Sequence, residues 1–104
     1  MIINMTELPI MSWSPEQLEA ARKLCTDGII RGYEMPTILP SDSSLRVRFI
    51  AWNTADEVKA LDPEAIIIQG EPVFVAAFIE RYGRRTKCYS PCYKDDKFVQ
   101  FRRF

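Results

Sequence analysis

The chain has 104 residues, a length typical of one domain, so a second folded domain is excluded and we expect a single domain over residues 1–104. With 47% hydrophobic and 27% charged residues that sum to a net charge of zero, the composition is that of an ordinary globular protein. The longest apolar runs fall far short of the ~18–20 residues that cross a bilayer, and no signal-peptide pattern precedes them. We therefore expect no membrane partner and a cytoplasmic location.

The sequence contains three cysteines and no histidine. An odd cysteine count in a chain with no secretory signal favours free thiols at Cys25, Cys88 and Cys92. Without histidine, histidine-dependent catalytic triads are excluded and a zinc site is remote. We expect neither a metal ion nor another cofactor.

The charges are unevenly distributed along the chain. Residues 81–104 hold eight basic and two acidic side chains, a net charge of +6, which leaves −6 for the first eighty residues. Clustered Lys and Arg raise the local concentration of phosphates, so the basic quarter indicates an anion-binding half. The alternative is a solvated face, because clustering in sequence does not guarantee clustering in space.

The first third of the chain is predicted to form a strand, a helix and a second strand. Met1–Met5 is a short apolar run typical of a buried strand. A capping box that opens at Ser14 begins a helix predicted over Pro15–Thr26, with Gly28 as its stop. The β-branched and aromatic residues of Gly28–Met35 predict a second strand.

The middle of the chain is ambiguous. Leu45, Phe49 and Trp52 share one helical face, although the same stretch also alternates like a strand, and we favour the helix. A second capping box over Thr54–Glu57 predicts a separate short helix that ends before Pro63.

The last third contains the clearest strand, because three consecutive isoleucines indicate burial on both faces of a sheet. The alternation of strands and helices predicts an α/β, three-layer, small Rossmann-like domain with a mostly parallel central sheet. The elements predicted in this third are a strand over Ala65–Gln69, a buried helix over Val73–Tyr82, a strand over Thr86–Ser90 ended by Pro91, a turn over residues 94–97 and a strand over Phe98–Phe104.

Ligands of such sheets bind outside the carboxyl ends of the strands, which selects three segments: Asn4–Thr6, Gln69–Pro72 and Ser90–Cys92. Gly70 lets the backbone approach a ligand, and the helix behind it offers unpaired N–H groups for a phosphate. Pro72 removes one of these N–H groups, and Glu71 repels an anion unless its side chain turns outward or meets a base or hydroxyl of the ligand. A tight turn with no ligand is the alternative.

The remaining motifs in the sequence do not indicate a specific ligand or activity. There is no Gly-x-Gly-x-x-Gly fingerprint and no P-loop, so classical dinucleotide binding is unsupported. The acidic pairs Asp56–Glu57 and Asp95–Asp96 are more typical of a helix start and a turn than of metal ligands. Trp13 and Trp52 are predicted to be core or interface anchors, with stacking of Trp13 on a base as the alternative.

The run Ile66–Glu71, the apolar helix after it and the closing Phe98–Phe104 together resemble the small stand-alone CRISPR-associated ring nucleases, whose fold is a reduced CARF (CRISPR-associated Rossmann-fold) domain. In that family a hydrophobic strand ends in Gln-Gly-acidic and the chain closes with an aromatic-rich strand. The likeness covers the two ends and the second half best.

The resemblance implies a homodimer that binds a cyclic oligoadenylate, most often cyclic tetraadenylate, across its two-fold axis and cleaves it without metal to switch off a type III CRISPR response. The attacking group is the ribose 2′-OH of the ring itself, so placing it in line with the phosphate supplies much of the acceleration. Long nucleic acids are not expected partners.

The resemblance carries Gln69, Gly70 and Glu71 into the site, and strand-end position alone adds Thr6 and Ser90. Relatives often show Ser-His after the first strand, where this chain has Asn4-Met5-Thr6. Arg84, Arg85 and Lys87 are candidates for binding an anion only because they belong to the basic segment 81–104. The expected catalytic residues are Gln69, Glu71 and Thr6, and the expected ligand-binding residues are Asn4, Met5, Trp13, Gly70, Pro72, Ser90, Arg84, Arg85 and Lys87.

Two alternatives remain open. The missing histidine favours a non-catalytic CARF-like sensor or sponge that holds the messenger. A small α/β interaction protein is the other, in which the apolar helix Val73–Tyr82 only forms a subunit interface. Dimerisation is itself expected, from the apolar density of that helix and the aromatic C-terminal strand.

Overall fold

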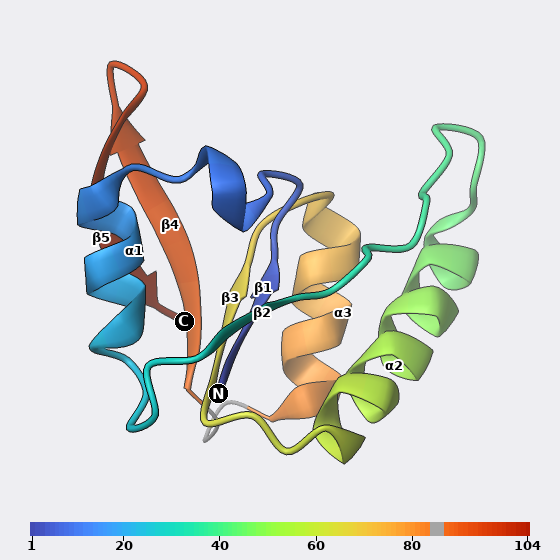
Figure 1. Ribbon diagram of the computed structural model, residues 1–104. Coiled ribbons are helices and arrows are strands. Elements are labelled where there is room, and N and C mark those ends of the chain that lie inside the picture. The colour runs from blue at the N-terminus through green and yellow to red at the C-terminus, as the bar shows by residue number, and fades with distance from the viewer. Residues whose placement is uncertain (84–86) are drawn as a thin grey trace.

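The computed structural model describes residues 1–83 and 87–104, in which one five-stranded sheet has helices on both faces (Figure 1). The strand order is β2-β1-β3-β4-β5, and all neighbours are parallel except β4 and β5. The expected α/β class with a mostly parallel sheet is confirmed. The elements are β1 (Ile2–Met5), a 3-10 helix (Ile10–Ser12), α1 (Pro15–Arg22), β2 (Ile30–Gly32), α2 (Ser44–Ala60), β3 (Ala65–Ile68), α3 (Pro72–Tyr82), β4 (Cys88–Lys94) and β5 (Lys97–Arg103).

The central strands β1 and β3 are buried along their whole length. They pair in parallel from Ile2 opposite Ala65 to Met5 opposite Ile68. Side chains alternate between the two faces of a strand, so each face of the sheet receives two residues from each of these strands. The prediction of a central, doubly buried strand at the three isoleucines is confirmed.

Two hydrophobic clusters fill the space above and below the sheet. On one face, Ile2, Ala65 and Ile67 pack with Trp13 and with Ala21 of α1. On the other face, the alternate strand residues pack with α2 and α3, which also pack against each other. Figure 1 shows this division, with α1 on one side of the sheet and the pair α2 and α3 on the other.

A single helix, α2, replaces the two helices expected between residues 45 and 62. Its N-cap is Ser43, whose hydroxyl accepts from the backbone N–H of Arg46. Thr54 does not begin a helix; its hydroxyl donates to the carbonyl of Ile50 at 2.8 Å, one turn earlier in the same helix. The buried stripe of α2 runs without interruption along the helix, through Val47, Ala51, Thr54, Ala55 and Val58.

The helix after the first strand ends earlier than expected. α1 stops at Arg22, with Lys23 as its C-cap, and beyond it Thr26 donates its backbone N–H to Glu64 while Asp27 accepts from the backbone N–H of Ile29. Gly28, with φ +68°, therefore turns the chain into β2 instead of ending the helix. β2 itself is limited to three residues.

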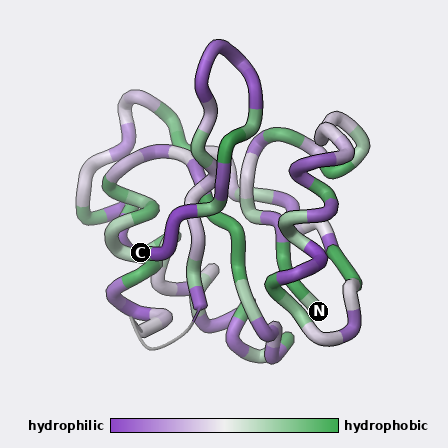
Figure 2. The backbone as a smooth tube through the Cα atoms, turned by 90° about the vertical axis from the view of Figure 1, so that its left-hand side faces the viewer, coloured by the Kyte–Doolittle hydropathy of each residue, from purple (hydrophilic) through white to green (hydrophobic). Residues whose placement is uncertain are grey.

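The strand β4 continues through Pro91, where an end was expected. β3 pairs only with the first two residues of β4, so the β3 side of Pro91 needs no backbone donor. Asp95 and Asp96 both have positive φ at the tip of the β4–β5 hairpin, as a two-residue type I′ turn requires. Figure 2 shows this hydrophilic tip projecting from the molecule.

Within residues 1–83 and 87–104, none of the helices combines the length and the apolar character that a membrane crossing needs.

The single α2 helix makes a testable prediction about caps. Ser43→Ala removes a true N-cap and is expected to lower the free energy of unfolding by about 1 kcal/mol. Thr54→Val keeps the side-chain shape inside a helix and is expected to change it by less than about 0.5 kcal/mol. Urea denaturation of both variants measures the difference. A larger loss for Thr54→Val than for Ser43→Ala would contradict one continuous helix.

Candidate functional site

The carboxyl ends of β1 and β3 diverge, because β1 leads into α1 on one face of the sheet and β3 leads into α3 on the other (Figure 1). Such a switch point is where open α/β sheets bind ligands. A hollow of about 280 Å³ lies there, lined by Glu7 and Leu8 after β1 and by Gln69 and Gly70 after β3. We call it the switch-point crevice.

Two larger hollows flank this crevice. The α3 groove, of about 890 Å³, runs from Gln69 and Gly70 between the outer face of α3 and β4 toward Phe104. The β2 recess, of about 490 Å³, shares Glu7 with the crevice and extends to Tyr33. The remaining lining of the groove is Ile68, Pro72, Val75, Ala76, Ile79, Glu80 and Ser90. Gln69 and Gly70 are thus the residues common to the crevice and the groove.

Gln69 and Gly70 are exposed, and the Gln69 backbone N–H donates to the carbonyl of Met5 at 3.3 Å. Among the described residues, no hydrogen bond uses the Gln69 side chain or the backbone N–H groups of Gly70 and Glu71. The nearest atom to a Cβ added at Gly70 is the Met35 Cε, 4.0 Å away, so the space above this glycine is open. The expectation that the backbone can be approached at Gly70 fits this geometry.

Glu71 caps α3. Its carboxylate accepts from the backbone N–H of Phe74 at 2.8 Å and of Val73 at 3.1 Å. The expectation that these first-turn N–H groups receive a phosphate is therefore wrong, because a carboxylate of the chain already occupies them. Pro72 holds the first helical position, where its missing N–H costs nothing.

The expected ligand residues after β1 form a buried structural network. Asn4 Oδ1 accepts from both the backbone N–H and the hydroxyl of Thr6, at 3.1 and 2.7 Å. The Asn4 amide and the Trp13 indole N–H each donate to the carbonyl of Leu8 at 3.1 Å, and the Thr6 hydroxyl oxygen lies 3.1 Å from the same carbonyl. This network fixes the loop between β1 and α1, and it uses the hydroxyl expected for catalysis.

Trp13 and Met5 are core residues. Trp13 is 6% exposed and lies 6.1 Å from the ring of Phe101, centroid to centroid. Met5 is fully buried in the cluster under α2 and α3. Stacking of a base on Trp13 and ligand contact by the Met5 side chain are therefore wrong; the core-anchor interpretation of Trp13 is confirmed.

Ser90 lines the α3 groove but does so from within β4, and not from a loop after the strand. Lys87 lies at the opposite end of the sheet, since its carbonyl accepts from the N–H of Ile66, near the start of β3. Including it in this site was therefore wrong. Arg84 and Arg85 lie outside the described residues.

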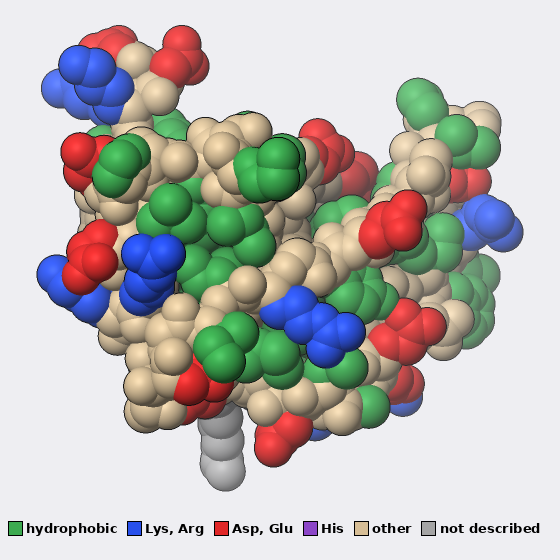
Figure 3. Space-filling model, viewed as in Figure 1, with side chains coloured by type: hydrophobic (Ala, Val, Ile, Leu, Met, Phe, Trp, Pro, Cys, Tyr) green, Lys and Arg blue, Asp and Glu red, His purple; other side chains and the backbone are tan. Residues whose placement is uncertain are grey.

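The described lining of the three hollows is acidic. It contains the carboxylates of Glu7, Glu34 and Glu80 and neither Lys nor Arg. The basic quarter is dispersed instead: Arg81 pairs with Asp56 at 3.1 Å, and Lys94 and Lys97 stand at the hairpin tip, which projects at the upper left of Figure 3. Within the described ranges, the solvated-face interpretation of this charge is the one that fits.

Phe104, Ile79 and Glu80 line the groove and were missed from the sequence. The apolar helix α3 was recognised, but periodicity does not show which of its faces remains uncovered. The structure buries Phe74, Phe78 and the other core residues of α3 and leaves Val75, Ala76 and Glu80 toward the groove.

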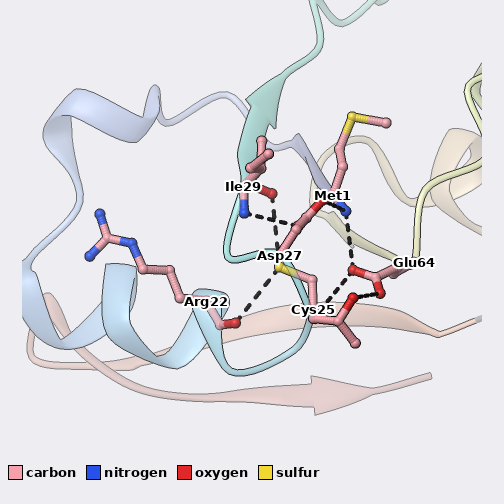
Figure 4. Close-up of polar contacts among 7 residues, drawn as sticks. Met1, Arg22, Cys25, Asp27, Ile29 and Glu64 are labelled. Atoms are coloured by element: carbon pink, nitrogen blue, oxygen red, sulfur yellow. Dashed lines mark hydrogen bonds and ion pairs between the residues drawn. The ribbon is translucent and has the colours of Figure 1, made fainter.

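A second polar cluster lies at the amino-terminal edge of the sheet, where the Met1 ammonium contacts Asp27 at 2.9 Å and Glu64 at 3.1 Å (Figure 4). The Cys25 thiol and the two carboxylates place their ligand atoms within 4.8 Å of one another, a set that suits a divalent cation. The ammonium stands between these carboxylates, and burial raises the pKa of the Cys25 thiol. In this arrangement the cluster forms two ion pairs, from the Met1 ammonium to Asp27 and to Glu64.

This ion-pair cluster predicts how the stability depends on pH. The ammonium lowers the pKa of Asp27, hydrogen bonds from Thr26 lower the pKa of Glu64, and Asp27 raises the pKa of the Met1 ammonium above 8.0. The carboxylate contributions are lost as the pH falls through the lowered pKa values. The ammonium contribution is lost as the pH rises through its raised pKa.

Melting temperatures from about pH 3 to pH 10 should therefore show the largest advantage of the native chain over the double variant Asp27→Asn, Glu64→Gln in the middle of this range. The advantage should shrink toward both ends. A constant difference across the range would refute the role of the ion pairs.

The cap at α3 makes a separate prediction. Glu71→Ala should lower the free energy of unfolding by about 1 kcal/mol, because two first-turn N–H groups lose their acceptor. Glu71→Asp retains an N-cap carboxylate and should recover most of this loss. Urea denaturation measures both variants, and equal stability of Glu71→Ala and the native chain would show that the cap contributes nothing.

Comparison with family models, with curated proteins and with solved structures finds no match to this chain. Its function is therefore inferred from the geometry at the carboxyl ends of β1 and β3, which we call the carboxyl edge of the sheet, and from the residues that lie there.

Proposed function

We propose that this chain is a CARF-like ring nuclease that acts as a homodimer, binds cyclic tetraadenylate at the carboxyl edge of its sheet and opens the ring without a metal ion. The observation that carries the proposal is the position of Gln69 and Gly70. They border both the switch-point crevice and the α3 groove, and neither the Gln69 side-chain amide nor the Gly70 backbone N–H makes a hydrogen bond within the described residues. The Gln-Gly-Glu run that resembles the family thus coincides with the edge where such sheets bind ligands.

The reaction needs no nucleophilic side chain, because the ring supplies its own nucleophile. The ribose 2′-oxygen attacks the adjacent phosphorus, the bond to the 5′-oxygen breaks, and the hydroxyl proton ends on the departing 5′-oxygen, so that a 2′,3′-cyclic phosphate and a 5′-hydroxyl result. Gln69 is the positioning donor: its amide and the N–H of Gly70 hold a non-bridging phosphate oxygen. Donors aimed at the charge that develops on a phosphate stabilise the transition state.

The α3 groove suits the bases better than the phosphates. Val75, Ala76 and Ile79 form an apolar wall, and the exposed ring of Phe104 lies at its end. Adenine has an apolar face that stacks on such surfaces. The acidic lining offers no cation among the described residues, so the phosphates depend on neutral donors at Gln69 and Gly70.

A second candidate is a sensor or sponge that binds the ring without cutting it. The observation that favours it is the commitment of the other expected catalytic groups. The Thr6 hydroxyl is held between Asn4 and Leu8, and the Glu71 carboxylate caps α3. Neither is available as a general base in this arrangement.

Incubation of the purified chain with cyclic tetraadenylate in excess EDTA, followed by mass spectrometry of the products, tests the proposal. Linear products with a 2′,3′-cyclic phosphate are expected. Gln69→Ala should slow ring opening by about a hundredfold, the loss typical of one such donor. Gly70→Leu fills the open space above the crevice and should abolish binding, whereas Gly32→Leu, which fills the neighbouring β2 recess, serves as the matched control.

Retention of an intact ring would identify the sensor. Neither retention nor cleavage would refute the assignment for this ligand and leave the interaction protein. Cleavage that survives both Gln69→Ala and Gly70→Leu would place the active site elsewhere.

A further inference from the structure

Arg102 of β5 lies at the rim of the α3 groove, beside two residues that line it. It is paired with Ser90 of β4 across the antiparallel ladder, and Ser90 lines the groove. Residues directly opposite each other in such a ladder share one face of the sheet, with Cβ atoms about 5 Å apart. Phe104, two residues farther along the chain, lines the groove as well. Because residues i and i+2 of a strand point to the same face, the Arg102 side chain lies on the groove side of the sheet.

The neighbours of Arg102 in the chain, Phe101 and Arg103, lie on the opposite face of the sheet. Phe101 packs in the cluster on the α1 side, with its ring centroid 6.1 Å from that of Trp13. Arg103 is paired with Tyr89, which packs in the same cluster. The register shift between β4 and β5 lies nearer the hairpin tip, so the alternation of faces is regular over these residues. The two adjacent arginines are therefore both exposed but lie on opposite faces of β5.

Along the strands, Arg102 is level with the carboxyl end of β3. Ile67 of β3 is opposite Tyr89 of β4, so the next residues of these parallel strands, Ile68 and Ser90, are also level. Ile68 is the last residue of β3, and Ser90 is the partner of Arg102. Three neighbouring strands span about 10 Å, here from β3 across β4 to β5. The arginine therefore stands across β4 from the turn that follows β3.

The Arg102 guanidinium is available to a ligand. Arg102 is exposed, and among the described residues no carboxylate forms an ion pair with it. Arg81, by contrast, is paired with Asp56. The carboxylate of the groove, Glu80, belongs to the other end, because it follows Pro72 on α3 by a rise of about 12 Å along the helix axis. Within the described part of the chain, the groove thus has an unpaired cation beside its carboxyl-edge end and a carboxylate at the opposite end.

We propose that Arg102 binds the phosphate that Gln69 and Gly70 hold, from the opposite side of the α3 groove. The inference rests on the proposed function and adds a residue to its site. A phosphate over β4 lies between the turn after β3 and the groove face of β5. The neutral donors of the turn then reach one non-bridging oxygen, and the long side chain of Arg102 brings its guanidinium to the other. The lining itself supplies only neutral donors, and the cation comes from the strand beside it.

A guanidinium suits this position for two reasons. Its planar fork directs several N–H groups at a phosphate, and such charge-assisted hydrogen bonds are stronger than neutral ones. Negative charge also develops on the phosphate oxygens as the 2′-oxygen attacks, and a fixed cation stabilises that charge. All three residues belong to one chain, so a ring held across a two-fold axis meets one such set from each copy. The inference therefore requires no particular contact surface between the copies.

The test compares variants of the two adjacent arginines. Calorimetric titration uses a cyclic tetraadenylate whose riboses lack the 2′-hydroxyl, because this ring keeps its bases and phosphates but cannot be opened. Arg102→Gln should raise the dissociation constant at least about tenfold, the loss typical of a charged hydrogen bond. It should also reduce the slope of log Kd against log salt concentration by about one for each arginine that touches the ring. Arg103→Gln removes the same charge from the other face and should leave the dissociation constant within about twofold and the slope unchanged.

Arg102→Lys keeps the charge without the planar fork, so it should restore the salt dependence and only part of the affinity. Circular dichroism checks that each variant is folded, and Arg102→Met replaces Arg102→Gln if that variant is not. Equal effects of Arg102→Gln and Arg103→Gln would overturn Arg102 as a phosphate ligand, while ring opening by the native chain would leave the proposed function standing. A native chain that neither binds nor opens the ring would remove both.

Discussion

The parallel pairing of β1 with β3 is the contact on which the remaining structure depends. Both strands are four residues long, buried throughout and central in the sheet. Because both faces of these strands must be shielded from water, helices are required on both sides, and the chain provides α1 for one face and the pair of α2 and α3 for the other. The same pairing brings the loops after β1 and β3 together and thereby creates the switch-point crevice.

The loop after β1 shows how a polar cluster at a strand end can serve the fold. Asn4 and Trp13 both donate to the carbonyl of Leu8, and Thr6 donates to Asn4, so that this loop turns the chain away from the sheet. Buried polar groups need partners, and here they find them in one another. What remains for a ligand at the carboxyl ends of the strands is the segment after β3, where the Gln69 side chain and the Gly70 backbone N–H make no hydrogen bond among the described residues.

Charged side chains, too, can be engaged in the fold and therefore not be available to a ligand. Glu71 looks like a candidate acid or base in the sequence, yet it satisfies the first turn of α3. Arg81 belongs to the basic quarter of the chain, yet it pairs with Asp56 across the α2 and α3 packing.

The sequence by itself determined the elements whose signals are local. These signals act through neighbours a few residues away: the isoleucine run of β3, the capping box at Ser14, and Pro72 with Gly83 at the two ends of α3. In the structure β3, the start of α1 and both ends of α3 lie at these residues. The continuity of α2 was also readable, because its buried spacing runs unbroken past Thr54; a capping-box pattern was mistaken for a helix start there. Tertiary structure alone decided which polar groups at the carboxyl edge are consumed by folding, that Lys87 lies at the far edge, and which face of α2 stays outside. These depend on contacts between residues distant in sequence, such as Trp13 with Phe101 and Asp56 with Arg81, and no local pattern contains them.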